Sequence, residues 1–288
     1  MNIIPDTELI ITDNSKIYHL NLSKEQIGDN IILVGDPERV SLVSMNFDSI
    51  EYKVNNREFI THTGTLNNKK ISVISTGIGT DNIDIVMNEL DALVNINFKT
   101  RKIREKKKSL NIIRIGTSGA IHPETKIDTF IASSYALGLD NLAYFYKKQD
   151  IIEQDMVEKY IKDTCWPQEI GKPYFIKVNQ KLLDKFSDLD NGITATAPGF
   201  YAAQGRKLRL TPSINNLNEK MRNFNYKGLK IKNFEMETSA LYYLSKNLGH
   251  NSLTICAIIG NRNTNEYSKN YKKTIKKLIK LTLNRMLE

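Results

Sequence analysis

The sequence predicts an α/β protein that folds as a single domain over residues 1–288. Short runs of β-branched residues end at glycine turns, and stretches with apolar residues three and four apart lie between those runs. The chain is 40% hydrophobic over 288 residues, which is enough for one sizeable core. We find no internal repeat and no low-complexity linker, so a second domain is not expected.

The predicted strands share a β-branched run and a turn residue soon after it. The three strongest candidates are 31–34, 71–75 and 111–115, which lead to the turns at Gly35, Gly77 and Gly116. Later candidates cover 129–133, 193–197 and 253–259.

Three amphipathic helices are expected. The first begins after Asp81 as N-cap and buries a stripe from 83 to 94. The second runs through 236–248 and ends at Gly249. The last, over 271–286, has lysines on one side. It is compatible with a membrane surface, but docking on the sheet with the lysines in water is the commoner arrangement.

The composition excludes several protein classes. Two cysteines, Cys165 and Cys256, rule out a disulfide framework, and the four histidines lack the spacing of metal ligands on one helix turn. No run of about 18 apolar residues occurs, so no transmembrane helix is expected. Residues 1–6 lack the basic and apolar regions of a signal peptide, which predicts a cytoplasmic protein.

The net charge of +9 is concentrated in two segments. Residues 98–110 carry +6 and residues 266–288 carry +5, which leaves −2 for the rest of the chain. Such runs are more often solvated faces than binding sites, so no nucleic-acid or membrane partner is expected. We expect 98–110 to be an exposed, basic helical insertion.

The first strand-end motif runs from Gly35 to Val40. In α/β sheets ligands bind beyond the carboxyl ends of strands. Gly35 permits close backbone approach, and Pro37 and Arg39 begin a helix whose first turn attracts anions. The alternative is an ordinary capped helix with Arg39 paired to a surface carboxylate.

Two further strand ends carry glycine turns. The turn at Gly77 lacks the third glycine of a dinucleotide fingerprint, because Asn82 stands there, and predicts only a generic ligand cradle. Arg114 lies in an otherwise apolar strand and needs a partner, either a protein carboxylate or a bound anion. Thr117 and Ser118 in the following turn favour the anion.

Taken in order, these segments resemble the nucleoside phosphorylase family, and within it the uridine phosphorylases most. The resemblance runs from about Tyr18 to the C-terminal helix. It implies a central mixed, distorted sheet flanked by helices. It also implies phosphorolysis, in which inorganic phosphate attacks C1′ of a nucleoside and yields free base and ribose 1-phosphate. The motifs are Tyr18-His19-Leu20, Gly35 to Val40, Arg57-Glu58-Phe59, Ser75 to Gly79, Arg114 to Gly119, Phe200-Tyr201 with Gln204-Gly205-Arg206, Glu235-Met236-Glu237 and Asn261-Arg262.

The resemblance implies roles for the residues that bind phosphate and ribose. It implies a homo-oligomer with shared active sites, because Arg57 and His19 would reach a neighbouring subunit's phosphate and 5′-hydroxyl. No cofactor is implied beyond phosphate as co-substrate, and a structural potassium ion near Glu58 and Ile78 is compatible with the family. The phosphate set is Gly35, Arg39, Arg57, Arg114 and Thr117, and the ribose set is His19, Met236 and Glu237.

The implied base site points to a pyrimidine. Gln204 and Arg206 would hold uracil, Phe200 would stack on it and Arg262 would support the pocket. Arg206 would stabilise the departing base anion and, with Arg39 and Arg114, is an expected catalytic residue. Purine-specific relatives place an aspartic acid after the late strand. Asn261 stands there, and an amide is no general acid.

The sequence therefore predicts a uridine phosphorylase of pyrimidine salvage, a pentosyltransferase. A phosphorylase for purine nucleosides, thymidine or deoxyuridine, or a hydrolytic nucleosidase, is the alternative within the family. From a different class, a catalytically idle relative would bind RNA or another anionic partner through the two basic segments.

Overall fold

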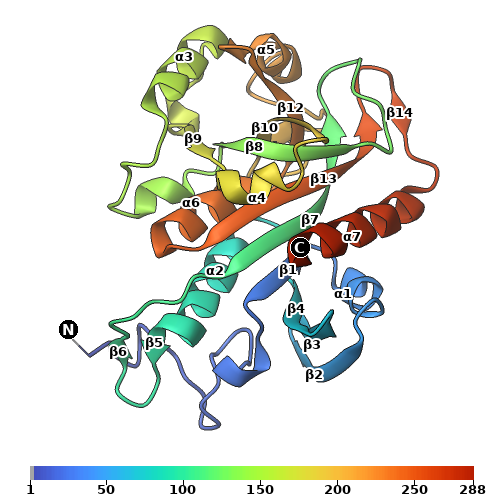
Figure 1. The fold of residues 1–288 in the computed structure, drawn as a ribbon. Helices are drawn as coiled ribbons and strands as arrows, with labels where there is room; N and C mark the ends of the chain where they lie inside the picture. Colours follow the sequence, from blue (N-terminus) through green and yellow to red (C-terminus); the bar gives the residue numbers. More distant parts are fainter. Residues whose placement is uncertain (1–2) are drawn as a thin grey trace.

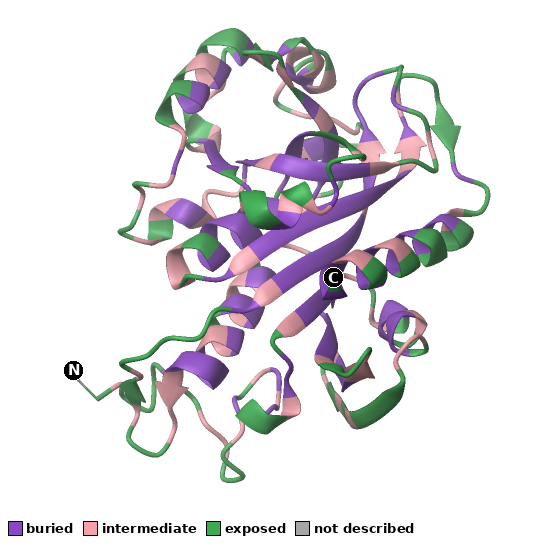
Figure 2. Cartoon of the chain, viewed as in Figure 1, coloured by how far each residue is buried: buried purple, intermediate pink, exposed green. Residues whose placement is uncertain are grey.

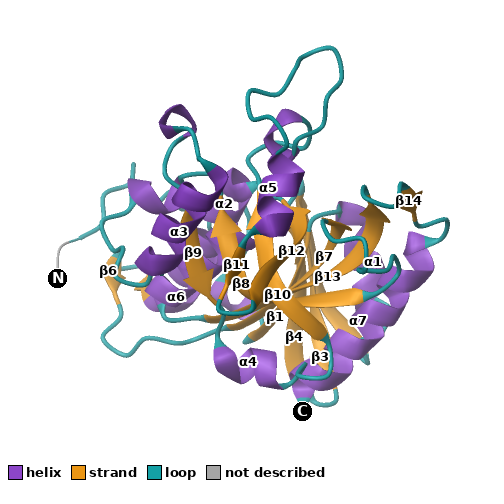
Figure 3. Ribbon diagram, turned by 90° about the horizontal axis from the view of Figure 1, so that it is seen from above, coloured by secondary structure: helices purple, strands orange, loops and turns teal. Residues whose placement is uncertain are grey.

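The computed structural model describes residues 3–288 and contains one large mixed sheet with helices on both faces (Figures 1 and 3). Residues 1–2, at the start of the N-terminal stretch used above, lie outside the described residues. The middle of the sheet is parallel: β4 (Lys69–Ser75), β1 (Asn30–Val34), β7 (Asn111–Ala120) and β13 (Asn251–Asn261) are neighbours in that order. The mixed α/β fold predicted from the sequence is confirmed.

Antiparallel strands extend this parallel centre on both sides. β3 (Phe59–Leu66) and β2 (Ser49–Asn56) follow β4, and β8 (Phe130–Gly138) pairs with β13. β10 (Asp190–Thr196) and β12 (Leu229–Glu235) continue parallel to β8. β9 (Tyr174–Lys177), β11 (Asn225–Tyr226) and β14 (Glu266–Tyr267) add short edges.

The sheet closes on itself at one point. β12 also pairs antiparallel with β7, through Asn233 with Ala120 and Phe234 with Gly119. Strands β7, β13, β8, β10 and β12 therefore form a closed ring of hydrogen-bonded neighbours. We call these strands the five-strand ring; they bring the ends of β12 and β13 next to the carboxyl end of β7.

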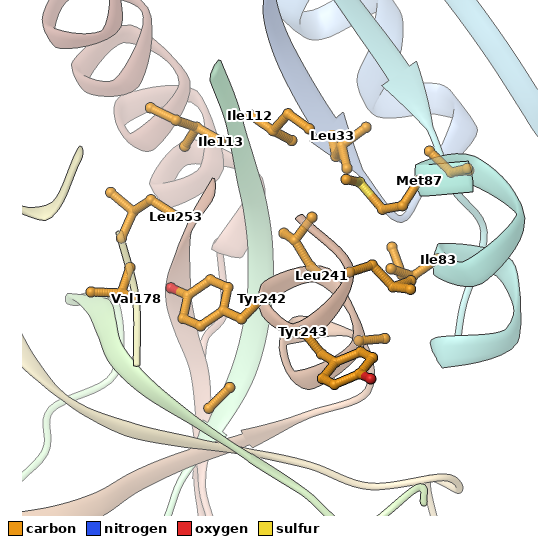
Figure 4. Packing of buried hydrophobic residues seen from close by; sticks show 14 of the residues in the cluster. Leu33, Ile83, Met87, Ile112, Ile113, Val178, Leu241, Tyr242, Tyr243 and Leu253 are labelled. Carbon is orange, nitrogen blue, oxygen red and sulfur yellow. The ribbon is translucent and has the colours of Figure 1, made fainter. Parts of the chain in front are cut away.

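The helices cover the two faces of the sheet. α2 (Thr80–Asn95) and α6 (Thr238–Leu248) pack together on one face, and α7 (Tyr271–Leu287) lies along β7 and β13 on the other (Figure 1). Figure 4 shows Ile83 of α2 and Leu241 of α6 in the core beside Leu33 of β1. The strands between these helices are almost entirely buried (Figure 2). The remaining helices are α1 (Pro37–Ser44), α3 (Gln154–Thr164), α4 (Gln180–Asp184) and α5 (Leu217–Asn223).

The predicted helices exist, but two begin at other residues. The N-cap of α2 is Gly79, at φ 104°, and Asp81 lies within its first turn. α6 starts at Thr238 because the Glu235 carboxylate accepts the backbone N–H groups of Glu237 and Thr238. It ends at Gly249 with φ 82°, as predicted.

The expected docking of the C-terminal helix is confirmed. Ile275, Leu278 and Ile279 of α7 are buried against the sheet, whereas its lysines are exposed. Among the helices of residues 3–288, none has both the length and the apolar character needed to cross a membrane.

The predicted helical insertion at 98–110 is wrong. β5 (Ile96–Asn97), just before the segment, forms a small hairpin with β6 (Lys102–Ile103) inside it. The rest of the segment is irregular chain. The Asn97 side chain accepts the backbone N–H groups of Lys99 and Thr100, a local bond that competes with a helix. Arg101, at φ 53°, donates to the carbonyls of Ile4, Pro5 and Leu9 and so anchors the N-terminal segment.

Candidate active site

A cavity of about 790 Å³ opens where the carboxyl ends of β1, β4, β12 and β13 meet the second half of β7. This volume is in the usual range for a small-molecule site, roughly 300–1,000 Å³. Ten of the residues predicted for phosphate, ribose and base line it. They are Gly35, Arg39, Arg114, Thr117, Phe200, Gln204, Arg206, Met236, Glu237 and Arg262.

Arg39 brings a buried positive charge to the cavity wall. Asp36 caps α1 by accepting the Glu38 N–H at 2.9 Å, with Pro37 at the first helical position, so Arg39 is held in the first turn. Its side chain donates to the Ile115 carbonyl at 3.2 Å and forms no ion pair within residues 3–288. Burial lowers the pKa of Arg39; Asp36 opposes this effect and Arg114 adds to it. The surface-carboxylate alternative for Arg39 is therefore not what the structure shows.

Arg114 shows the carboxylate alternative instead. Its Nη2 donates to Glu237, and its Nη1 lies 3.3 Å from Glu235 Oε2. Burial alone would lower the pKa of Arg114, but Glu237 and Glu235 together raise it. Nε and Nη1 are buried and have no hydrogen-bond acceptor among the described residues. Arg114 is thus neutralised by Glu237 and Glu235, and its two nitrogens without an acceptor are enclosed by the protein.

Gly116 makes room for this guanidinium. A Cβ at position 116 would lie 2.2 Å from Arg114 Nη1 and 3.0 Å from Cys256 Sγ. Any side chain there would displace Arg114, because both neighbours are buried. The predicted strand end and turn at Gly116 are wrong, because β7 continues through Gly116 to Ala120; the glycine instead leaves space for the guanidinium within the strand.

Glu235 and Glu237 form a carboxylate pair at the start of α6. Glu235 accepts the Thr196 hydroxyl at 2.7 Å as well as the backbone N–H groups of α6. Glu237 accepts the Gly79 N–H at 3.0 Å, which ties the turn before α2 to the site. The strand β12 ends at this point, so both carboxylates face the cavity.

At another part of the cavity wall, an amide and two guanidinium groups meet. Gln204 is buried, and its Oε1 accepts from Arg206 Nη1 at 2.6 Å. The Arg206 guanidinium also lies over the Phe200 ring, 3.8 Å from the ring centroid. Arg262 donates to the Gln204 carbonyl and to Asn218. Burial, with a contribution from Arg206, lowers the pKa of Arg262 to about 10.

Known proteins share this fold and sequence pattern. Residues 29–288 match the family described as the phosphorylase superfamily. The chain belongs to this superfamily. Within it, the chain is a nucleoside phosphorylase, a pentosyltransferase by family.

The relatives include both uridine phosphorylases and purine nucleoside phosphorylases. A uridine phosphorylase of Thermococcus kodakarensis is 29% identical over 90% of this chain and 82% of its own. A DeoD-type purine nucleoside phosphorylase of Streptococcus pyogenes is 29% identical over 85% of this chain and 86% of its own. A crystal structure of a Trypanosoma brucei nucleoside phosphorylase, described as showing uridine phosphorylase activity, superimposes with a TM-score of 0.89. It is 26% identical and covers 97% of this chain and 99% of its own.

In this nucleoside phosphorylase the amide of Asn261 is fully engaged. Its Nδ2 donates to the His122 and Thr125 carbonyls, each at 2.9 Å, and its Oδ1 accepts the Asn263 N–H. Asn261 holds the loop after β7 and offers no acid to a ligand. The exposed Glu266 is a cavity-lining carboxylate on the same side, bonded to the Thr264 hydroxyl.

Two predicted residues lie outside the cavity of their own chain. Arg57 is exposed at the turn between β2 and β3, with its guanidinium 5.7 Å from the Tyr18 ring centroid. The rings of His19 and Tyr18 pack edge to face, with their centroids 4.8 Å apart. Although they lie far apart in sequence, Arg57 and His19 share one surface cluster with Tyr18. Their expected role in a neighbouring subunit stays a prediction.

Sequence reasoning missed some residues of the site. The sequence placed Glu235 only in the motif Glu235-Met236-Glu237, without a role of its own, yet it is ion-paired with Arg114. Asn82 and Tyr267 also line the cavity. The apolar character of β7 around Arg114 was the one available signal, since a buried guanidinium requires anionic partners. Glu58 and Ile78 line the cavity as well, and the potassium ion stays a prediction.

The burial of Glu237 predicts a pH-dependent stability. Burial raises the pKa of Glu237 to about 7, against the opposing effect of Arg114, so the folded chain keeps this proton to higher pH than the unfolded chain. The stabilisation is complete below the ordinary pKa of about 4.5 and is lost as the pH rises through 7.

Compared with Glu237→Gln, the wild type should therefore lose up to about 3 kcal/mol of unfolding free energy between pH 5 and pH 8. Urea unfolding of both proteins at several pH values measures this loss. Glu266→Gln is the matched control for an exposed cavity carboxylate. A constant difference between wild type and Glu237→Gln over this range contradicts the expectation.

Proposed function

We propose that the protein is a uridine phosphorylase, which converts uridine and inorganic phosphate to uracil and ribose 1-phosphate. The observation that carries the proposal is the composition of one cavity. Three features line it: Arg39, which has no carboxylate partner within residues 3–288, the carboxylate pair Glu235 and Glu237, and the amide–guanidinium pair Gln204–Arg206. The cytoplasmic location and the role in nucleoside salvage expected from the sequence are part of this proposal.

Phosphate would bind beside Arg39. The Arg39 charge is buried and has no carboxylate partner within residues 3–288, and Arg114, which also lines the cavity, would be the second guanidinium. Thr117 adds a hydroxyl and Gly35 a close approach of backbone. Guanidinium groups suit a dianion because they give paired, charge-assisted hydrogen bonds and keep their protons. The nucleophile is thereby aimed rather than activated by proton transfer.

Ribose would bind to Glu237, which Arg114 and the Gly79 N–H hold in place. A carboxylate has about four acceptor positions, and Arg114 and the N–H groups of Gly79 and Met236 use three, so Glu237 retains one for a sugar hydroxyl. Met236 beside it would contact the sugar ring.

The base would meet Gln204 and Arg206. As the glycosidic bond breaks, negative charge gathers on uracil, and the paired guanidinium groups of Arg206 and Arg262 would stabilise it. A purine leaving group instead profits from protonation, and the Asn261 amide supplies no proton. Phe200 would offer the base the ring face that Arg206 does not cover.

Turnover of three nucleosides tests the proposal. Uridine, thymidine and inosine are incubated with the protein, each with and without phosphate, and free base is followed by absorbance. We expect phosphate-dependent cleavage fastest with uridine. Faster cleavage of inosine would favour a purine nucleoside phosphorylase, and cleavage without phosphate would favour a nucleosidase.

Gln204→Leu tests the base site. We expect kcat/KM for uridine to fall about 100-fold, because one buried amide that bonds the base and Arg206 is lost. Phosphate affinity, measured by calorimetry, should stay within about twofold. Asn218→Ala is the control, since it removes a partner of Arg262 and leaves Gln204 in place. An equal loss in both variants would place the effect on loop stability instead.

A further inference from the structure

The carboxylate of Glu89 is hydrogen-bonded to both the backbone and the ring of His19. Glu89 Oε1 accepts the His19 N–H at 3.0 Å and is bonded to His19 Nδ1 at 2.6 Å, and Oε2 accepts the Leu20 N–H at 2.8 Å. Glu89 stands in the middle of α2, 70 residues from His19, and its side chain is only 12% exposed. Three bonds from one carboxylate to two adjacent residues are more than a surface ion pair provides.

These contacts determine which ring nitrogen of His19 carries the proton. A carboxylate only accepts, so Nδ1 carries a proton, and in the neutral ring Nε2 therefore keeps its lone pair. Asn56 Nδ2 donates to the His19 carbonyl at 2.7 Å and holds the backbone from the other side. The His19 side chain remains 28% exposed, and its Nε2 has no hydrogen-bond partner within residues 3–288.

We propose that Glu89 is a positioning residue that holds His19 in the Nδ1–H form, so that Nε2 accepts a hydrogen bond from the 5′-hydroxyl of a nucleoside bound to a second copy of the chain. This inference rests on the proposed function and on the shared active site expected for it. Glu89 itself touches no substrate. Its effect passes through His19, which lies with Arg57 and Tyr18 on the surface outside the chain's own cavity.

A nucleoside without the 5′-hydroxyl separates positioning from general stability. For Glu89→Ala at pH 8 we expect kcat/KM for uridine to fall at least about tenfold, the effect of one hydrogen bond. With 5′-deoxyuridine the loss should stay within about twofold. His19→Ala should give the same pattern, and the double variant should be no worse than His19→Ala alone.

Asp91→Asn is the matched control, because Asp91 also lies on α2 and pairs with a histidine, His250, at 3.2 Å. This variant should behave as wild type with both nucleosides. Equal losses of Glu89→Ala on uridine and 5′-deoxyuridine, or additive losses with His19→Ala, would overturn the proposal.

The protonation state is measured directly in the intact protein, without any substrate. The chain has four histidines, so ¹⁵N labelling of histidine gives few signals, and His19→Ala identifies the one that belongs to His19. We expect the Nδ1–H form in wild type and its loss in Glu89→Ala. An Nε2–H form in wild type would reject the role of Glu89 even if uridine is cleaved. The Nδ1–H form in a protein that cleaves no uridine would reject only the proposed function.

Discussion

Arg39→Ala is expected to lower kcat/KM for phosphate about a thousandfold, the largest effect on activity that the cavity predicts. The Arg39 guanidinium is buried and has no carboxylate partner within residues 3–288, so its charge is available to an anion. Loss of a pair of charge-assisted hydrogen bonds to phosphate corresponds to about 4 kcal/mol. Steady-state kinetics with varied phosphate, and calorimetric titration of phosphate, measure the loss.

Arg39→Lys serves as the comparison for this variant. A single ammonium keeps the charge but lacks the paired donors of a guanidinium, so we expect an intermediate loss of about 10- to 100-fold. The melting temperature of both variants should stay near that of wild type, because no ion pair within the described residues is broken. If Arg39→Ala keeps its phosphate affinity, the anion site lies elsewhere in the cavity.

Arg114→Ala is expected to have the largest effect on stability, a loss of about 3–5 kcal/mol in unfolding free energy. The change leaves Glu235 and Glu237 buried without their cation. In a chain of this size the loss corresponds to a fall in melting temperature of about 10 °C. Glu237→Gln should cost much less at pH 7, because Glu235 still neutralises Arg114.

Lower pH tests the electrostatic origin of this loss. Arg114 opposes the protonation of Glu237, so in Arg114→Ala this carboxyl takes up its proton more readily, and the stability deficit relative to wild type should shrink between pH 8 and pH 5. Chemical unfolding at both pH values measures it. A deficit that is the same at both pH values would mean that the loss comes from the cavity left by the side chain rather than from the unpaired charges.

The parts of this molecule that were predictable from sequence are local. A strand that stops at Gly35, a cap at Asp36 and a helix that ends at Gly249 each depend on residues a few positions apart. The turns at Gly35 and Gly77 follow from the same signals, whereas the glycine at 116 lies within β7 and makes no turn. For this reason the α/β fold was predicted correctly, and residues predicted for phosphate, ribose and base line one cavity, while their roles stay predictions.

The partners of these residues were not predictable, because they come from distant parts of the chain. Glu237 lies 123 residues from Arg114, and the alternatives of carboxylate and anion were indistinguishable without the β12–β7 pairing. The segment 98–110 was misjudged for another reason. Its charge pattern resembles a helix, but the Asn97 side chain and the attachment of Arg101 to the N-terminal segment favour a hairpin.

The five-strand ring has a consequence for attempts to change the substrate. Arg114 and Glu235 lie on two strands of this ring and are paired with each other, and Asn261 on β13 holds the loop after β7. A change in one of these side chains therefore removes a contact between neighbouring parts of the ring. Phe200 and Arg206 instead lie on the connection between β10 and α5, where residues 207–211 are exposed. New base selectivity should therefore be sought by varying that connection, with the residues of the five-strand ring left unchanged.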